Sequence, residues 1–254
     1  MRRYGSNEAM TNEQQDTPLS ESGRLAGVFL DPSRAFPDIA ERGRWWLVAL
    51  LLILMNVAAV SAMVSRVGYD RMIEKAFEQN PRLQEMTPEQ RMQAMETQRK
   101  FLPVAVRVFP PVGIFAGMLV VAGALLFSYR FLLDADVKYK QALNITAYSW
   151  LPPAVAGNLM FFAVLYLKPP DEFDAESASG LSIGSFLSRD TAAWLRSLAN
   201  SVDLFTIWTI VLIAMGFSSV CGKRKMPFSR SLCGVLAPWL VYVLGKMGIA
   251  ALTG

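Results

Sequence analysis

Long uncharged segments alternate with polar, charged segments along this chain. At a rise of about 1.5 Å per residue, roughly 20 apolar residues cross the hydrocarbon core of a bilayer as a helix. The pattern therefore predicts an all-α protein, a polytopic transmembrane helix bundle with five spans. The predicted spans are 45–65, 108–129, 141–167, 204–222 and 231–252.

Charges beside the fourth span predict the orientation of the bundle. Asp203 precedes this span, and the basic run Lys223-Arg224-Lys225 follows it. Basic clusters next to a span are retained on the cytoplasmic side. We therefore expect Asp203 outside and Lys223 inside, and five spans then give a cytoplasmic N-terminus and an external C-terminus.

Two segments precede the first span. Residues 1–22 are polar, with almost nothing to bury, and are expected to form a disordered cytoplasmic tail. Residues 23–44 are predicted to form an interfacial amphipathic segment, in which Asp31 caps a helix that has Pro32 at its first position. In this segment Phe36 is expected to enter the headgroup region, while arginines meet lipid phosphates. A solvated linker is the alternative.

The first span opens with Trp45 and Trp46, whose indole rings favour the membrane interface. After it, residues 66–107 are predicted to form an external helical insertion. A first helix over 70–79 is followed by a break, and a Thr87 capping box opens a second helix that ends near residue 101. Acidic and basic residues are interleaved throughout the insertion, which is typical of a solvated surface.

Two motifs inside the spans concern helix packing. Gly113 and Gly117 form a GxxxG pattern that permits close helix contact, either within this protein, which we favour, or between copies. Pro152 and Pro153 are expected to interrupt the third span, with Asn158 following them. Such a broken helix can line a substrate path, as in transporters. A packing kink with one interhelical hydrogen bond is the simpler interpretation, and we favour it.

Lys246 is a full charge within an otherwise apolar span, where a central lysine costs about 2.5–3.5 kcal/mol on insertion scales. Asp203 is predicted to lie near the same external face. The sequence therefore predicts an ion pair or a water-bridged contact between these two residues. In the alternative, Lys246 extends to the headgroups alone and Asp203 only caps its helix.

Composition restricts the chemistry. The chain is 53% hydrophobic and only 18% charged, and its net charge of +4 comes from short basic clusters beside the spans. Lipid explains these clusters better than nucleic acid does. The absence of histidine excludes Ser-His-Asp and Cys-His catalysis and the HExxH zinc site. Cys221 and Cys233 are expected to stay free thiols. We expect that the protein is not an enzyme and that it binds no cofactor, no metal and no nucleic acid.

Three sequence motifs point to a family. They are Leu25 to Phe36 ahead of Trp45, the segment Tyr139 to Leu143 leading to Tyr148-Ser-Trp-Leu-Pro152, and Val202 to Trp208 ending in Gly216. Together they resemble the bacterial branch of the Yip-domain membrane proteins, over roughly residues 24–252. The resemblance implies a five-span domain over residues 45–254 with a cytoplasmic N-terminus, in the bacterial cytoplasmic (inner) membrane. Eukaryotic relatives bind Rab-type GTPases, a role that we do not transfer.

Two functions remain in competition. The first is a scaffold or membrane-organising protein that acts through lipids and through other membrane proteins or further copies of itself. The second is a small-solute or ion transporter or channel, for which intramembrane polar residues would be the evidence. A polar cavity that reaches Asn158 or Lys246 would favour the transporter, whereas dry packing would favour the scaffold.

Overall fold

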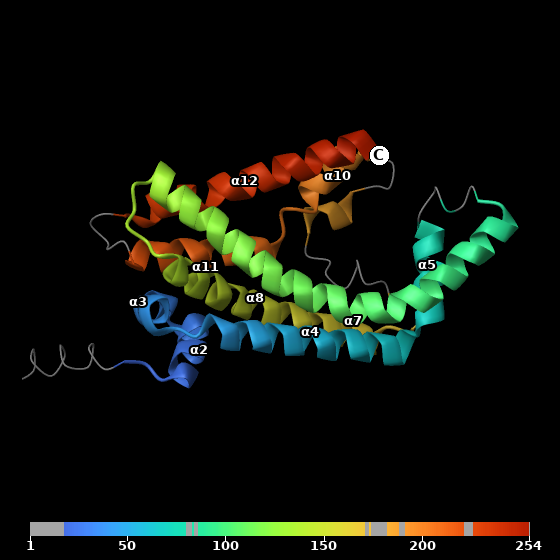
Figure 1. Cartoon of the computed structure of the whole chain (residues 1–254), viewed down its shortest axis with the longest axis horizontal. Helices are drawn as coiled ribbons and strands as arrows, with labels where there is room; N and C mark the ends of the chain where they lie inside the picture. The colour runs from blue at the N-terminus through green and yellow to red at the C-terminus, as the bar shows by residue number, and fades with distance from the viewer. Residues whose placement is uncertain are drawn as a thin grey trace, which may run out of the picture.

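Helices form almost all of the regular structure in a computed structural model that describes residues 18–79, 83, 86–170, 173, 182–187, 191–220 and 226–253. Five long helices lie side by side and form a bundle (Figure 1). They are α4 (Trp45–Val67), α7 (Pro88–Phe127), α8 (Tyr139–Leu167), α11 (Leu204–Val220) and α12 (Phe228–Thr253). The basic run 223–225, Cys221 and most of the predicted tail lie outside the described residues.

Shorter helices lie at the two ends of the bundle. At one end are α2 (Glu21–Leu30) and α3 (Pro32–Arg42). At the other end are α5 (Tyr69–Gln79), the short turn η2 (Ile183–Phe186) and α10 (Ala193–Ala199), which packs on α12. The C-terminal end of α12 and the α2–α3 pair therefore lie at opposite ends of the bundle (Figure 1).

Four of the bundle helices, α4, α7, α8 and α12, are long and apolar enough to cross a membrane. The fifth, α11, is apolar on all sides but has only 17 residues, or about 25 Å. It packs against α3, α8 and α12, and its residues Ile210, Leu212, Ile213, Ala214, Gly216 and Phe217 are buried. The fold is thus an all-helical membrane bundle, and the count of five spans stays a prediction.

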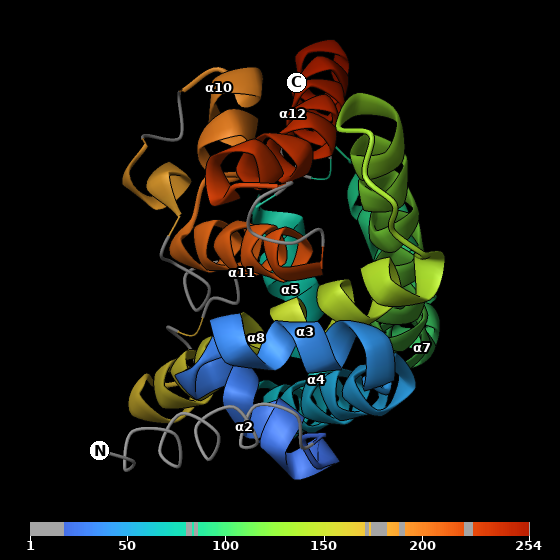
Figure 2. The ribbon, with the colours of Figure 1, turned by 90° about the vertical axis from the view of Figure 1, so that its left-hand side faces the viewer.

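The α2–α3 pair lies across the ends of the long helices (Figure 2). The apolar side of α3 packs on α8 and α11, so that Phe36 and Ile39 are fully enclosed by protein. The expectation that Phe36 enters the headgroup region is therefore wrong, because the bundle itself covers this face. Phe29 and Leu30 at the end of α2 are exposed instead, Leu30 at 84%.

Prolines do not divide the long helices where the sequence suggested. The capping box of Thr87 and Gln90 is confirmed, but the helix that it opens continues to Phe127 through three internal prolines, without a break near residue 101. Likewise α8 runs unbroken through the buried Pro152 and Pro153, so the predicted interruption is wrong. A proline removes one helical hydrogen bond, but neighbouring bonds and packing on both sides hold the helix together.

Buried hydrogen bonds join helices where α7 continues into a short π-helical segment, η1 (Ser128–Leu132). Ser128 Oγ donates to the Gly234 carbonyl at 2.7 Å, and Tyr129 OH donates to the Ser231 carbonyl at 2.7 Å. The Tyr129 ring also stacks on Phe217, with centroids 3.9 Å apart. These contacts join α7, α11 and α12 at the end that carries α2 and α3.

Candidate functional site

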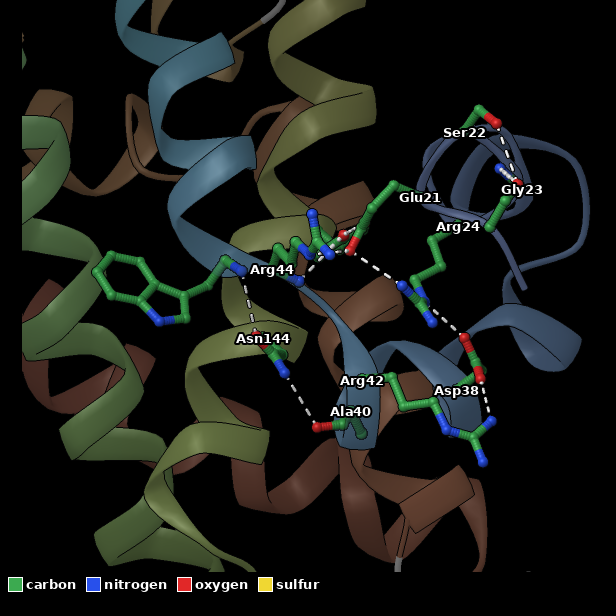
Figure 3. A network of polar contacts seen from close by, with 12 residues as sticks. Glu21, Ser22, Gly23, Arg24, Asp38, Ala40, Arg42, Arg44 and Asn144 are labelled. Carbon is green, nitrogen blue, oxygen red and sulfur yellow. Dashed lines mark hydrogen bonds and ion pairs between the residues drawn. The ribbon is translucent and has the colours of Figure 1, made fainter. Parts of the chain in front are cut away.

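Buried and half-buried charges join α2 to α3 (Figure 3). The Arg24 side chain, only 8% exposed, donates to Glu21 Oε1 at 2.9 Å and to Asp38 Oδ2 at 2.5 Å. Asp38 Oδ1 accepts a further bond from the exposed Arg42 at 2.8 Å. Both partners of Arg24 are carboxylates, so the buried guanidinium is neutralised where it lies.

Glu21 carries this network onto the bundle. Its Oε2 accepts a hydrogen bond from Tyr148 OH of α8 at 2.6 Å, and Arg44 Nε lies 3.6 Å from its Oε1. We call Glu21, Arg24, Asp38, Arg42, Arg44 and Tyr148 the N-terminal polar network. It ties the first described helix to a helix more than 100 residues further along the chain.

Electrostatics keep Arg24 charged within this network. Burial by itself lowers the pKa of Arg24, but the hydrogen bond and charge of Asp38, together with those of Glu21, raise it above its ordinary value. An arginine is protonated in proteins at any ordinary pH. Arg24 therefore keeps its charge and holds the carboxylates of Glu21 and Asp38 together at the junction of α2 and α3.

Asn144 holds the chain where α3 leads into α4 (Figure 3). This side chain is fully buried; its Nδ2 donates to the Ala40 carbonyl at 3.0 Å, and its Oδ1 accepts from Trp45 N at 3.2 Å. Both backbone groups would otherwise lack these partners at the junction of two helices. Sequence reasoning missed Asn144 and Tyr148, although their spacing of four residues within an uncharged span places them on one helix face.

The residues predicted at the interface lie around this junction. Asp31 Oδ1 accepts from Arg34 N at 3.2 Å and caps α3, and Pro32 is the first residue of that helix. A hydrogen bond from Ser33 and the bond from Arg34 N lower the pKa of Asp31. The Trp45 ring packs on Phe115, with centroids 5.9 Å apart, while Trp46 is 52% exposed. Of the two indoles, only that of Trp46 is largely open to the surroundings.

At the opposite end, Asp203 and Lys246 do not form the predicted ion pair. Asp203 accepts from Thr206 N at 2.9 Å and from Thr206 Oγ1 at 2.5 Å, so that it caps α11. Lys246 Nζ donates to Ser201 Oγ at 3.3 Å. The direct ion pair is thus wrong, and the cap that the sequence offered as the alternative is the one that Asp203 makes. A water-bridged contact between the two residues stays a prediction.

Two cavities open in the bundle near the predicted polar residues. One, of about 540 Å³, reaches Lys246; the other, of about 350 Å³, is lined by Asn56 and Asn158 among others. Trp150 and Thr209 line both cavities. Asn158 donates within its own helix, to the Ala154 carbonyl at 2.9 Å, so the expected interhelical bond is not the one that it makes.

The glycine motif of α7 does not serve close packing within the chain. A Cβ atom added to Gly113 would meet no atom within 4 Å, and one on Gly117 would lie 3.7 Å from Trp150. The intramolecular contact that we favoured is therefore wrong for Gly113, which faces open space. Contact between copies stays a prediction.

A comparison with protein families now decides the relationship. The Yip1 domain matches residues 26–249, which is most of the chain. The chain belongs to the Yip1 domain family. No curated protein and no solved structure matches it. The matched Yip1 region contains Asp38, Asn144 and Tyr148 of the junction, whereas Glu21 and Arg24 precede it. The family resemblance expected from the sequence is thereby confirmed, and the protein is an integral membrane protein of the Yip1 type.

Proposed function

We propose that this Yip1-domain protein is a membrane scaffold or organising protein of the bacterial inner membrane, with five spans and no enzymatic activity. The observation that carries the proposal is the fixed position of α2 and α3. The N-terminal polar network and Asn144 clamp this pair onto α8, and α3 also packs on α11. The pair is therefore a rigid platform at the membrane border, as a scaffold requires.

The platform presents apolar side chains that the rest of the chain does not cover. Leu30 is 84% exposed and Phe29 is 41% exposed, beside the polar cap of α3. An exposed apolar pair beside charged groups is typical of a surface that meets lipid or another protein. Embedding in the bilayer gives the chain lipid contacts in any case, and the platform adds a place for a protein partner or a second copy.

Site-specific photocrosslinking in native membranes tests the proposal. A photoreactive residue at Leu30 should give discrete protein adducts. The same residue at Met92, which is also exposed but lies on the far arm of α7, should give none. Adducts with lipid alone at Leu30, or an identical adduct pattern at both positions, would contradict a scaffold that acts through this platform.

The transporter alternative has the two cavities as its observation. Their walls are mostly apolar, which does not favour a hydrated path. Purified protein in liposomes should therefore leave the flux of small ions at the background of empty vesicles. A flux that Asn158→Leu abolishes would support the transporter instead.

A further inference from the structure

The cavity that reaches Lys246 has a size and a position that the scaffold role does not use. Its volume of about 540 Å³ lies within the range of about 300–1,000 Å³ that small-molecule sites occupy. Its walls come from α7, α8, α11 and α12 and from the residues that follow α10. We call it the Lys246 cavity.

The Lys246 cavity is polar at one end and apolar along its length. Asn200, Ser201 and Thr206 line it next to Lys246, at the junction of α10 and α11. From there to Val235 the wall that α12 contributes spans about 11 residues, or roughly 16 Å. Apolar side chains line this stretch: Leu125, Ile210, Ile213, Val235, Pro238 and Trp239. The cavity therefore matches a molecule with a polar head and a hydrocarbon chain.

Charge indicates what the head must be. Among the described residues that line the cavity, Lys246 is the one that carries a charge. Its ammonium has three donors, and among the described residues it reaches only Ser201 Oγ, at 3.3 Å. The nearby carboxylate of Asp203 is held by Thr206. A half-buried cation with spare donors, and with no carboxylate partner in the part of the chain that the structure describes, is matched by an anion from outside the protein.

The way into the cavity indicates where that anion comes from. Helices α7 and α12 meet near Tyr129 and Gly234 and diverge toward the end that carries α10 (Figure 1). The cavity lies between these diverging helices, with exposed Val120 and Ala124 on one side and exposed Tyr242 on the other. Helices α7 and α12 both have the length and apolar composition of membrane spans, so this side faces lipid.

We propose that the Lys246 cavity binds an anionic membrane phospholipid, with its phosphate at Lys246 and Ser201 and one acyl chain along α12 toward Val235. The apolar length of the cavity supplies the chain contacts, and the ammonium supplies the preference for an anionic headgroup. This site is separate from the α2–α3 platform, which lies at the other end of the bundle. The proposal therefore stands whether or not the scaffold function does.

Native mass spectrometry of the full chain in detergent tests the site, with phosphatidylglycerol and phosphatidylcholine of the same acyl chains as probes. Wild type should retain phosphatidylglycerol about tenfold better. Lys246→Met should remove this preference, and Lys246→Arg should keep it. The matched control is Lys168→Met, which removes an exposed lysine at the same end of the bundle but outside the cavity.

Two further arms separate the possible sources of the effect. Ala124→Trp fills the apolar part of the cavity from an exposed position and should weaken the binding of both lipids. Millimolar inorganic phosphate should not displace the bound lipid. Displacement by phosphate would show that the site takes a free anion, and it would overturn the proposal. Equal retention of the two lipids by wild type, or an unchanged preference in Lys246→Met, would overturn it as well. If Lys246→Met fails to fold, the comparison of lipid retention by Ala124→Trp with that by Lys168→Met decides: the proposal requires weaker retention in Ala124→Trp only.

Discussion

At the residue scale, single buried polar side chains determine how the N-terminal helices meet the bundle. Asn144 forms hydrogen bonds with two backbone groups at the junction of α3 and α4, and Arg24 links two carboxylates on different helices. Removing one partner of a buried hydrogen bond costs about 1–3 kcal/mol, because the group left behind loses its water as well. Replacing either residue with an apolar one is therefore expected to destabilise the folded protein.

Asn144→Leu should lower the thermal stability of the detergent-solubilised protein by about 1–3 kcal/mol, since the Trp45 amide and the Ala40 carbonyl lose their side-chain partner. Thermal unfolding followed by circular dichroism measures the loss. The matched control is Asn158→Leu, because the Asn158 amide bonds only within its own helix and is half-buried. Equal losses from both variants would show that Asn144 does not hold the junction.

Arg24→Met should release α2 from α3, because Asp38 and Glu21 then face each other without the guanidinium between them. The expected cost is about 1.5–3 kcal/mol, the contribution of hydrogen bonds to charged groups. Hydrogen exchange of the α2 amides should rise accordingly. Arg42→Met removes a 56% exposed partner of the same Asp38 and should change exchange little, as exposed ion pairs contribute about 0–1 kcal/mol. Protection of α2 that is unchanged in Arg24→Met would contradict the clamp.

Sequence reasoning located some of these residues but not their partners. The cap formed by Asp31 and Pro32 depends on neighbours in the chain, and such local signals can be read directly. The partners of Asn144 and Tyr148 lie about 100 residues or more away, and a single sequence does not show which distant groups will meet. The direct Asp203–Lys246 pair failed for the opposite reason: the local cap on Thr206, which the sequence offered as the alternative, takes the carboxylate.

At the element scale, α11 packs on α3, α8 and α12, and Gly216 makes its contact with α3 and α8 possible. A Cβ atom there would lie 2.5 Å from Ile145 Cγ2 of α8 and 3.0 Å from Phe36 Cδ1 of α3. Both distances are shorter than van der Waals contact. The three helices can therefore meet only where this side chain is absent.

Gly216→Ala should destabilise the protein by about 1–3 kcal/mol through overpacking. Ile145→Ala removes the atom that lies closest to the new methyl group, so the double variant should lose less stability than the two single variants added together. Gly113→Ala is the control: its Cβ meets nothing within 4 Å, so it should be neutral or slightly stabilising. Thermal unfolding of wild type, the three single variants and the double variant gives the comparison. Strict additivity of Gly216→Ala and Ile145→Ala would argue against the contact.

Element positions were easier to predict than element ends. Uncharged length located α4, α8, α11 and α12 to within a few residues. Proline misled the prediction at Pro152 and Pro153, because a proline signals only a missing hydrogen bond and does not show whether the packing around it holds the helix together. The helix after Thr87 was predicted too short, since it continues from residue 101 into the span. The GxxxG motif also misled the prediction, since the motif permits close contact without specifying a partner.

At the scale of the whole molecule, the passage of α11 through the membrane decides the topology. If α11 crosses, the α11–α12 connection and the α2–α3 pair share one side and the C-terminal end of α12 lies on the other. If it does not cross, the α11–α12 connection lies on the side opposite the α2–α3 pair, and the C-terminal end of α12 lies on the same side as that pair. With 17 residues, α11 is at the lower limit for a spanning helix.

Reporter fusions settle this question. A reporter that is active only in the cytoplasm should be bright after Arg224 and dark after Gly254, as the basic run beside α11 predicts. An alkaline phosphatase reporter, active only outside, should give the opposite result at both positions. Dark after Arg224 and bright after Gly254 would contradict this arrangement of α11 and α12.

The unbroken length of α7 sets a distance outside the membrane. Its 40 residues span up to about 60 Å, whereas bilayer hydrocarbon is about 30 Å thick. Its first turns, with α5 packed against them, therefore stand as much as about 30 Å clear of the acyl chains (Figure 1). A flat or bulky object approaching that side of the bilayer meets this arm before it meets the headgroups. The protein thus carries its own spacer, whose height depends on the length of this arm and on the angle at which α7 bends away from the bundle (Figure 1).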